Sequence, residues 1–228
     1  MQLSESTIQV LRNYANINPN IVIDKGNELK TMTEARNLYS IAKIRDEFPV
    51  RFGIYDLNEF LRVMDLVEEP NFEPTFESAT ISGSGGTSKI KYYFTDPDMI
   101  TTPPRAPKLP ETWEVQFELN ASTINRIKSA ASALGHKQIC ISPSNGTIGI
   151  TVCDPENKTS NTFSIDVAGS YKEDPFELYL SIDNLKCILP GTYGVNISSK
   201  LVSKFVSTNN ELPIEYVIAL EKNSKYGV

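Results

Sequence analysis

The sequence predicts an α+β protein that consists of two copies of one small domain. A stretch that begins an amphipathic pattern at Leu3 to Ile8 is repeated at Leu119 to Ile124. Each is followed by an apolar triplet and a turn glycine, which are Ile21–Ile23 with Gly26 in the first copy and Ile139–Ile141 with Gly146 in the second. The later Phe52-Gly53-Ile54-Tyr55 is echoed by Phe176-Glu177-Leu178-Tyr179. A period this long indicates a duplicated domain, because solenoid repeats run about 20–50 residues.

The first copy shows the order helix, hairpin, strand, short helix and further strands. Ser4 or Ser6 is expected to cap a helix, which the Asn18-Pro19-Asn20 segment ends because proline cannot continue it. Ile21–Ile23 and Pro49 to Tyr55 are expected strands. A second helix is expected after Asp56 as N-cap, with its apolar positions at helical spacing: Leu57, Phe60, Leu61, Met64 and Val67.

The second copy gives clearer signals. Ile124, Ile127, Ala131 and Leu134 form an apolar stripe that Gly135 ends. Asn145-Gly146 between two apolar segments predicts a hairpin. A short helix is expected with Asp183 as its cap and Pro190-Gly191 after it. Strands are expected at Tyr193 to Ser198, Lys204 to Ser207 and Tyr216 to Leu220.

A segment with five prolines, Pro97 to Pro110, lies between the copies. Prolines exclude a sheet interior and favour an extended, stiff segment. We therefore expect an N-terminal domain at 1–98, a connector at 99–110 and a C-terminal domain at 111–228.

Composition indicates an ordinary cytosolic protein. Hydrophobic residues make up 40% and charged residues 22% of the 228 residues. No apolar run approaches the roughly 20 residues of a membrane span, and the N-terminus lacks the regions of a signal peptide. The three cysteines lack metal or redox spacing, which favours free thiols. The net charge of −6 argues against a protein that wraps nucleic acid.

Catalytic and metal-binding patterns are not recognisable, so we expect neither an enzyme nor a bound cofactor. His136 is the only histidine, and it is expected simply to follow a helix end. Gly83 to Lys89 lacks the Gly-Lys-Ser/Thr order of a phosphate loop, so we expect a hairpin loop there. Asp96 and Asp98 flank a proline and are expected to be turn residues.

All four expected helices carry a cation although the whole chain is acidic. On each helix the cation lies away from the apolar stripe, and the cations are Arg12, Arg62, Arg126, Lys128 and Lys186. The simpler interpretation is a solvated helix face, since such faces are usually polar. The alternative is that positive charge gathers on one surface.

The ordered set of motifs resembles the DNA polymerase sliding clamps of T-even-type tailed phages. The motifs run from Leu3 to Asn18, from Ile54 to Leu61, from Pro190 to Tyr193 and from Tyr216 to Glu221. The resemblance implies two processivity-fold domains per chain, with three chains in a head-to-tail ring, antiparallel sheets outside and helices on the inner face. It further implies that an ATP-dependent clamp loader places the ring on primed duplex DNA. The ring then tethers the replicative polymerase and takes part in late transcription, in the cytoplasm of the infected bacterium.

The resemblance also assigns roles to residues. The five helix cations would face the DNA phosphates without reading bases. An acidic exterior then suits a ring that slides, since it discourages binding of DNA outside. Edge strands would pair across subunits through Ile90, Tyr92, Phe94, Phe163 and Ile165, unless loops shield these edges.

Partner proteins are expected to dock their tails in an apolar groove beside the connector. The expected anchors are Ile100, Leu109, Leu212 and Tyr226, although Ile100 and Leu109 also suit the simpler role of pinning the connector onto the sheets. The rival to a ring is a duplicated binding module of a phage accessory or structural protein. A divergent enzyme would need a catalytic cluster that the sequence does not display.

Overall fold

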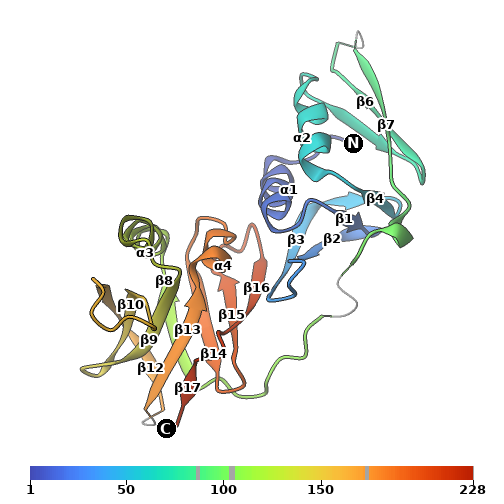
Figure 1. Cartoon of the computed structure of the whole chain (residues 1–228). Coiled ribbons are helices and arrows are strands. Elements are labelled where there is room, and N and C mark those ends of the chain that lie inside the picture. The colour runs from blue at the N-terminus through green and yellow to red at the C-terminus, as the bar shows by residue number, and fades with distance from the viewer. Residues whose placement is uncertain (86–87, 103–105, 173–174, 228) are drawn as a thin grey trace. The chain divides into compact units, whose positions relative to one another are not determined.

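The computed structural model describes residues 1–85, 88–102, 106–172 and 175–227, and the chain folds as two compact units. The N-terminal unit comprises Met1–Ala106 with Leu212–Ile214, and the C-terminal unit comprises Pro107–Glu211 with Glu215–Val228. Each combines helices with antiparallel strands, so the predicted α+β class is confirmed (Figure 1). Residues 103–105 of the predicted connector and residues 86–87 of the predicted loop lie outside the described residues.

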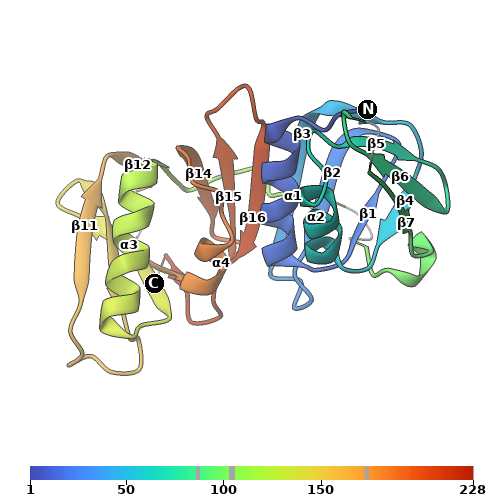
Figure 2. The same cartoon turned by 90° about the horizontal axis from the view of Figure 1, so that it is seen from above.

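The N-terminal unit contains two helices over antiparallel strands. Its elements are α1 (Glu5–Ile17), β1 (Ile21–Ile23), β2 (Gly26–Met32), β3 (Leu38–Phe48), β4 (Phe52–Ile54), α2 (Leu57–Asp65), β5 (Asn71–Pro74), β6 (Ser78–Ser82), β7 (Lys89–Tyr93) and the 3-10 turn η1 (Pro97–Met99). Strand β1 pairs with β4, β2 with β3, and β6 lies between β5 and β7. Figure 2 shows α1 and α2 side by side.

The predicted caps of this unit are confirmed. The Ser4 hydroxyl accepts a hydrogen bond from the Thr7 backbone N–H, and the Asp56 carboxylate accepts one from the Glu59 N–H at 3.0 Å. Each satisfies a backbone donor that a helix start leaves without a partner. The long strand β3 has no counterpart among the sequence predictions.

The C-terminal unit holds two helices and two groups of strands. Its elements are β8 (Val115–Leu119), α3 (Ala121–Leu134), β9 (Gln138–Ser144), β10 (Thr147–Cys153), β11 (Phe163–Val167), β12 (Gly169–Tyr171), β13 (Phe176–Ser181), α4 (Ile182–Lys186), β14 (Tyr193–Ser198), β15 (Val202–Ser207), β16 (Ile214–Ala219) and β17 (Lys225–Tyr226). The strands lie in the orders β11-β10-β9-β13-β17 and β12-β8-β14-β15-β16.

The local features that the sequence predicted for this unit are confirmed at the end of α3 and at the β9–β10 turn, with one exception elsewhere. Gly135 ends α3 with a φ of 71°, in the left-handed region that glycine tolerates best. Asn145 and Gly146 both have positive φ in the β9–β10 hairpin, as a two-residue turn requires. The exception is the α4 cap, since the Ser181 hydroxyl accepts from the Asp183 N–H and Asp183 lies in the first turn.

The duplication is visible in the pairing of the strands. Ile21 pairs with Ile54 in the N-terminal unit, and Ile139 pairs with Leu180 in the C-terminal unit. The counterpart of Ile54 is therefore Leu180, two residues beyond the Leu178 that sequence comparison suggests. A shift of two residues keeps the same side chains facing the core, which is why the echo survives in the sequence.

Candidate nucleic-acid surface and subunit edges

The exposed helix surface carries nearly balanced charge. The four helices hold five cations and four carboxylates, the latter being Glu5, Glu59, Asp65 and Asp183. The helices therefore carry a charge of about +1 within a chain of net charge −6. Positive charge is thus enriched on the helices, but more weakly than the cations alone suggest.

Two of the predicted DNA-facing cations form an ion pair with a carboxylate of their own unit. The Arg12 guanidinium contacts both oxygens of Asp65 at 3.0 and 3.1 Å, which joins α1 to α2. The Lys186 ammonium lies 2.8 Å from Asp183 one turn earlier in α4. Both pairs are solvent-exposed, so each contributes little to stability and exchanges readily for another anion.

The remaining three cations differ in their surroundings. Arg62 is exposed and has no ion-pair partner within the described part of the chain. Lys128 is half-buried, its ammonium lies 3.5 Å from the Ile188 carbonyl, and burial lowers its pKa. The Arg126 guanidinium lies over the Phe163 ring, 5.7 Å from its centroid, at the edge of the C-terminal sheet.

Strand β7 forms one edge of the N-terminal unit. Among the described residues β6 is its only neighbour. Ile90 and Tyr92 pair with the buried Ile81 and Ala79, and the Tyr92 ring lies 5.4 Å from Phe60 of α2. This side of β7 therefore faces the helices and is apolar. The opposite side carries the exposed Lys89, Lys91 and Tyr93.

Strand β11 forms the corresponding edge of the C-terminal unit, where β10 is its only described neighbour. Phe163 and Ile165 pair with the buried Val152 and Ile150 on the side that α3 covers. Ser164 and Asp166 are exposed on the other side. The two strands predicted to be edges are therefore the outermost described strands of their sheets, and no residue in either strand is fully buried.

The start of the predicted connector is anchored to β4. Ile100 is buried, and a side chain added at Gly53 would meet its Cδ1 at 2.9 Å and the Thr95 carbonyl at 2.6 Å. The Thr95 N–H donates to the Gly53 carbonyl at 2.9 Å. Only glycine allows this close approach of two backbone segments. Ile100 therefore has the surroundings of a residue that pins the connector.

The other predicted docking residues lie nearer the surface. Leu109 is 39% exposed and Leu212 is half-buried. Tyr226 of β17 pairs with Phe176, the first residue of β13, and the two rings stack with centroids 6.0 Å apart. The half-buried Tyr226 ring closes this end of the C-terminal sheet.

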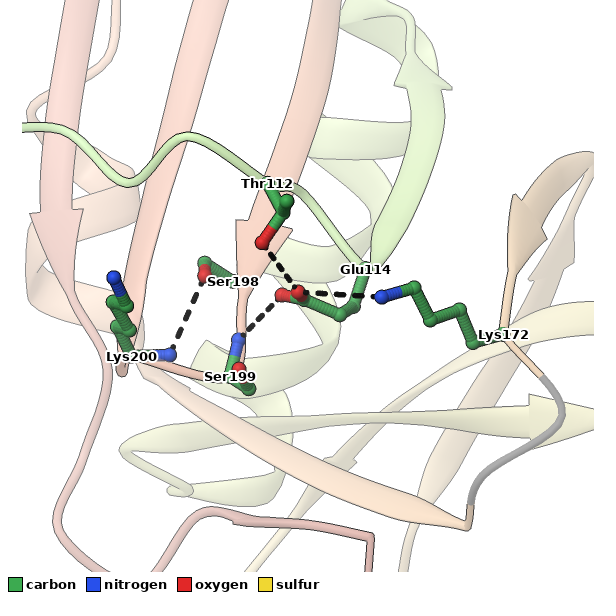
Figure 3. Close-up of polar contacts among 6 residues, drawn as sticks. All are labelled: Thr112, Glu114, Lys172, Ser198, Ser199 and Lys200. Carbon is green, nitrogen blue, oxygen red and sulfur yellow. Dashed lines mark hydrogen bonds and ion pairs between the residues drawn. The ribbon is translucent and has the colours of Figure 1, made fainter.

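Glu114 is a buried carboxylate that sequence reasoning did not single out. Figure 3 shows it between the Thr112 hydroxyl, which donates at 2.9 Å, and the Ser199 backbone N–H, which donates at 2.8 Å. The Lys172 ammonium lies 3.7 Å away. Burial alone would raise the pKa of Glu114, but these donors stabilise the charged form and hold it below its ordinary value. The contacts tie the start of β8 to the β14–β15 turn.

Other reactive groups form no recognisable chemical site. The described residues include no group of three or more metal-ligating side chains. The His136 ring nitrogen Nε2 lies 2.6 Å from the Asn161 carbonyl, just after the end of α3 as predicted. Burial raises the pKa of Cys140 to about 12, which keeps its thiol protonated and unreactive. No described helix is long and apolar enough to cross a membrane.

Comparison with known proteins identifies the family. Residues 4–101 match the family model of the DNA polymerase processivity factor, and residues 116–222 match that of the gp45 sliding clamp, C terminal. The sliding clamp of Vibrio phage KVP40 is 30% identical over 225 residues, which cover 97% of this chain and 99% of that protein. This chain belongs to the sliding-clamp family. The clamps of Escherichia phage RB69 and Enterobacteria phage T4 are each 26% identical to this clamp chain, over 99% of both.

Solved structures of sliding clamps have the same fold. The PCNA of A. fulgidus, solved with the C-terminal region of FEN-1 bound, gives a TM-score of 0.70 at 14% identity, with 96% of each chain covered. The PCNA of Entamoeba histolytica gives 0.69 at 10% identity, covering 96% of this clamp chain and 97% of its own. The predicted resemblance to T-even-type phage clamps is confirmed. This clamp is a phage DNA polymerase processivity factor and not an enzyme.

Proposed function

We propose that three copies of this clamp close head-to-tail into a ring that encircles duplex DNA and tethers the replicative DNA polymerase. The observation that carries the proposal is the pair of unpaired strand edges, β7 in one unit and β11 in the other. Two unlike edges on one chain favour a heterologous contact, which generates a closed ring when the rotation between copies permits. Main-chain hydrogen bonds between the edges would satisfy donors and acceptors that each strand leaves open.

The helices would line the hole of this ring. Arg12, Arg62, Lys128 and Lys186 would meet phosphates transiently or through water, without contact to base edges. Since Arg12 and Lys186 already hold carboxylates, direct affinity for DNA would be weak. Weak, non-specific contact suits a ring that holds DNA by topology and slides along it.

Partners would act on the same ring. An ATP-dependent clamp loader would open it around primed DNA in the host cytoplasm, and the polymerase would bind through its C-terminal tail. Leu109, with support from Leu212 and Tyr226, would provide apolar anchors for that tail, whereas the buried Ile100 would hold the connector. Late transcription factors of the phage would use the ring as a mobile platform.

The molar mass of the clamp in solution tests the ring directly. Light scattering at micromolar concentration is expected to give about 76 kDa, three times the 25.4 kDa of one chain. A mass near 25 kDa that stays unchanged when the concentration is raised tenfold would contradict a stable ring. That result would favour a duplicated binding module that works without ring closure.

A further inference from the structure

The two unpaired edges carry opposite charges on matching sides. On the side of β7 away from the helices, Lys89 and Lys91 are exposed and lie beside the uncharged Ser82 and Thr80 of β6. On the corresponding side of β11, Asp166 is exposed and lies beside Gly149 of β10. This outer side is therefore basic at the N-terminal edge and acidic at the C-terminal edge.

On the helix side the signs are reversed. Glu59 is exposed in the first turn of α2 and lies close to Tyr92 of β7, where burial and the Glu59 and Asp56 carboxylates raise the pKa of Tyr92 to about 12. At the other edge, Arg126 of α3 lies over Phe163 of β11. The helix side is thus acidic at the N-terminal edge and basic at the C-terminal edge.

Alternation along a strand fixes which of these charges can meet. Side chains in a strand point to opposite faces in turn. If two edge strands join so that the helices of both subunits lie on one face, the helix-facing side chains of both strands must therefore lie on that same face. The apolar rows of β7 and β11 then become continuous. In the same arrangement Lys89 and Lys91 share the outer side with Asp166, and Glu59 shares the helix side with Arg126.

Other pairings of the same edges are unfavourable. Two β7 edges joined with their helices on one face would bring lysines against lysines and Glu59 against Glu59. Two β11 edges would bring Asp166 against Asp166 and Arg126 against Arg126. Joining either edge to itself with helices on opposite faces would place an apolar row against a charged row. Like charges directly opposite each other destabilise a strand pair.

We propose that these edge charges determine head-to-tail order, because they allow the β7 edge of one copy to pair only with the β11 edge of the next. The occupant of each edge is a second copy of this chain, and this inference rests on the proposed ring. It also assigns Arg126 to the subunit contact with Glu59, in place of the phosphate contact that its helix position suggests. Like-charge repulsion as well as attraction then selects the partner edge.

A charge swap on the outer side tests the proposal. The variants are Lys91→Glu, Asp166→Lys and the two combined, with Lys222→Glu as a control that changes the net charge at an exposed site elsewhere. At about 0.1 M salt each single variant is expected to raise the dissociation constant of the trimer about fivefold to tenfold, and the combined variant to restore it within about threefold. The difference should shrink at about 1 M salt, where the Debye length falls to about 3 Å.

The outcomes separate the two hypotheses. A wild-type clamp that is monomeric would overturn the ring itself. Two results with a trimeric wild type would overturn the charge rule and leave the ring in place. In the first, the combined variant loses as much trimer affinity as the two single variants added together. In the second, the single variants have the same dissociation constant as Lys222→Glu. All three substituted positions are exposed, and unchanged thermal unfolding of the monomers would confirm that folding is not the cause.

Arg126→Glu and Arg62→Glu form a second, matched comparison. Both remove a helix arginine, but only Arg126 lies at an edge. Arg126→Glu is expected to dissociate the trimer, and the added change Glu59→Arg to restore it. Arg62→Glu is expected to leave the mass unchanged and to lower retention on DNA. A trimer that survives Arg126→Glu would overturn the assignment of Arg126.

Discussion

Replacement of Glu114 tests how the C-terminal unit is held at its start. In Glu114→Ala the Thr112 hydroxyl and the Ser199 N–H lose their charged acceptor. Hydrogen bonds to charged groups contribute about 1.5–3 kcal/mol each. Both donors belong to exposed residues that water reaches after the change, so the lower end of that range applies to each. The Lys172 pair adds little, because that lysine is solvent-exposed. We expect the free energy of unfolding to fall by about 3 kcal/mol at neutral pH.

Acid dependence gives a sharper test with Glu114→Gln. The pKa of Glu114 in the folded state lies below its ordinary value of 4.5. A carboxylate with a lowered pKa contributes stability that is present above the unfolded-state value and is lost as pH falls through the folded-state value. Urea unfolding of the wild type and of Glu114→Gln should therefore differ by about 1–2 kcal/mol at pH 7 and converge as the pH falls below about 4.5. Glu118→Gln, at an exposed position of the β8 strand that follows Glu114, is the matched control and should show no such convergence. A difference that is constant with pH would refute the reasoning.

Three further changes test other parts of the structure. Gly53→Ala should destabilise the N-terminal unit by about 1–3 kcal/mol, because the added Cβ would lie 2.6 Å from the Thr95 carbonyl oxygen. Unfolding in urea measures this change, and an unchanged midpoint would contradict the packing described. Asn120→Ala removes the cap of α3, in which the Asn120 side chain accepts from the Thr123 N–H at 2.9 Å, and should cost about 1 kcal/mol by the same assay, whereas Asn125→Ala should cost little. Leu109→Ala should weaken binding of the cognate polymerase's C-terminal peptide about tenfold by calorimetry and leave the trimer intact; equal affinity would place the docking site elsewhere.

The parts of the fold that depend on local chemistry were predictable from the sequence. Caps at Ser4 and Asp56, the glycine end of α3 and the Asn145-Gly146 hairpin each follow from a few neighbouring residues. Strand β3 shows that a signal can be present and still be missed. Leu38, Ala42, Ile44 and Phe48 lie on one face of this strand, and the charged Lys43, Arg45 and Glu47 lie on the other. The polar Ser40 and Asp46 interrupt the apolar face, which weakens the period of two in the sequence.

The features that could not be predicted are contacts between distant parts of the chain. Arg12 and Asp65 are 53 residues apart, and nothing near either one indicates the pair. Glu114 reaches Ser199 across 85 residues, so its burial is visible only in the folded unit. The position of Arg126 over Phe163 likewise depends on how α3 packs on β11. Helical spacing located the cations, but tertiary packing determined which of them contact another residue of the chain.

Retention on circular and linear DNA tests the central claim most directly. The clamp is placed by its loader on a closed circular duplex, at a salt concentration that abolishes direct binding, and the complex is separated from free protein by gel filtration. The circle is then cut once with a restriction enzyme, and the clamp still bound is measured again. A ring that holds DNA by topology is expected to stay on the circle and to run off after the cut. Equal retention on both forms would contradict encirclement.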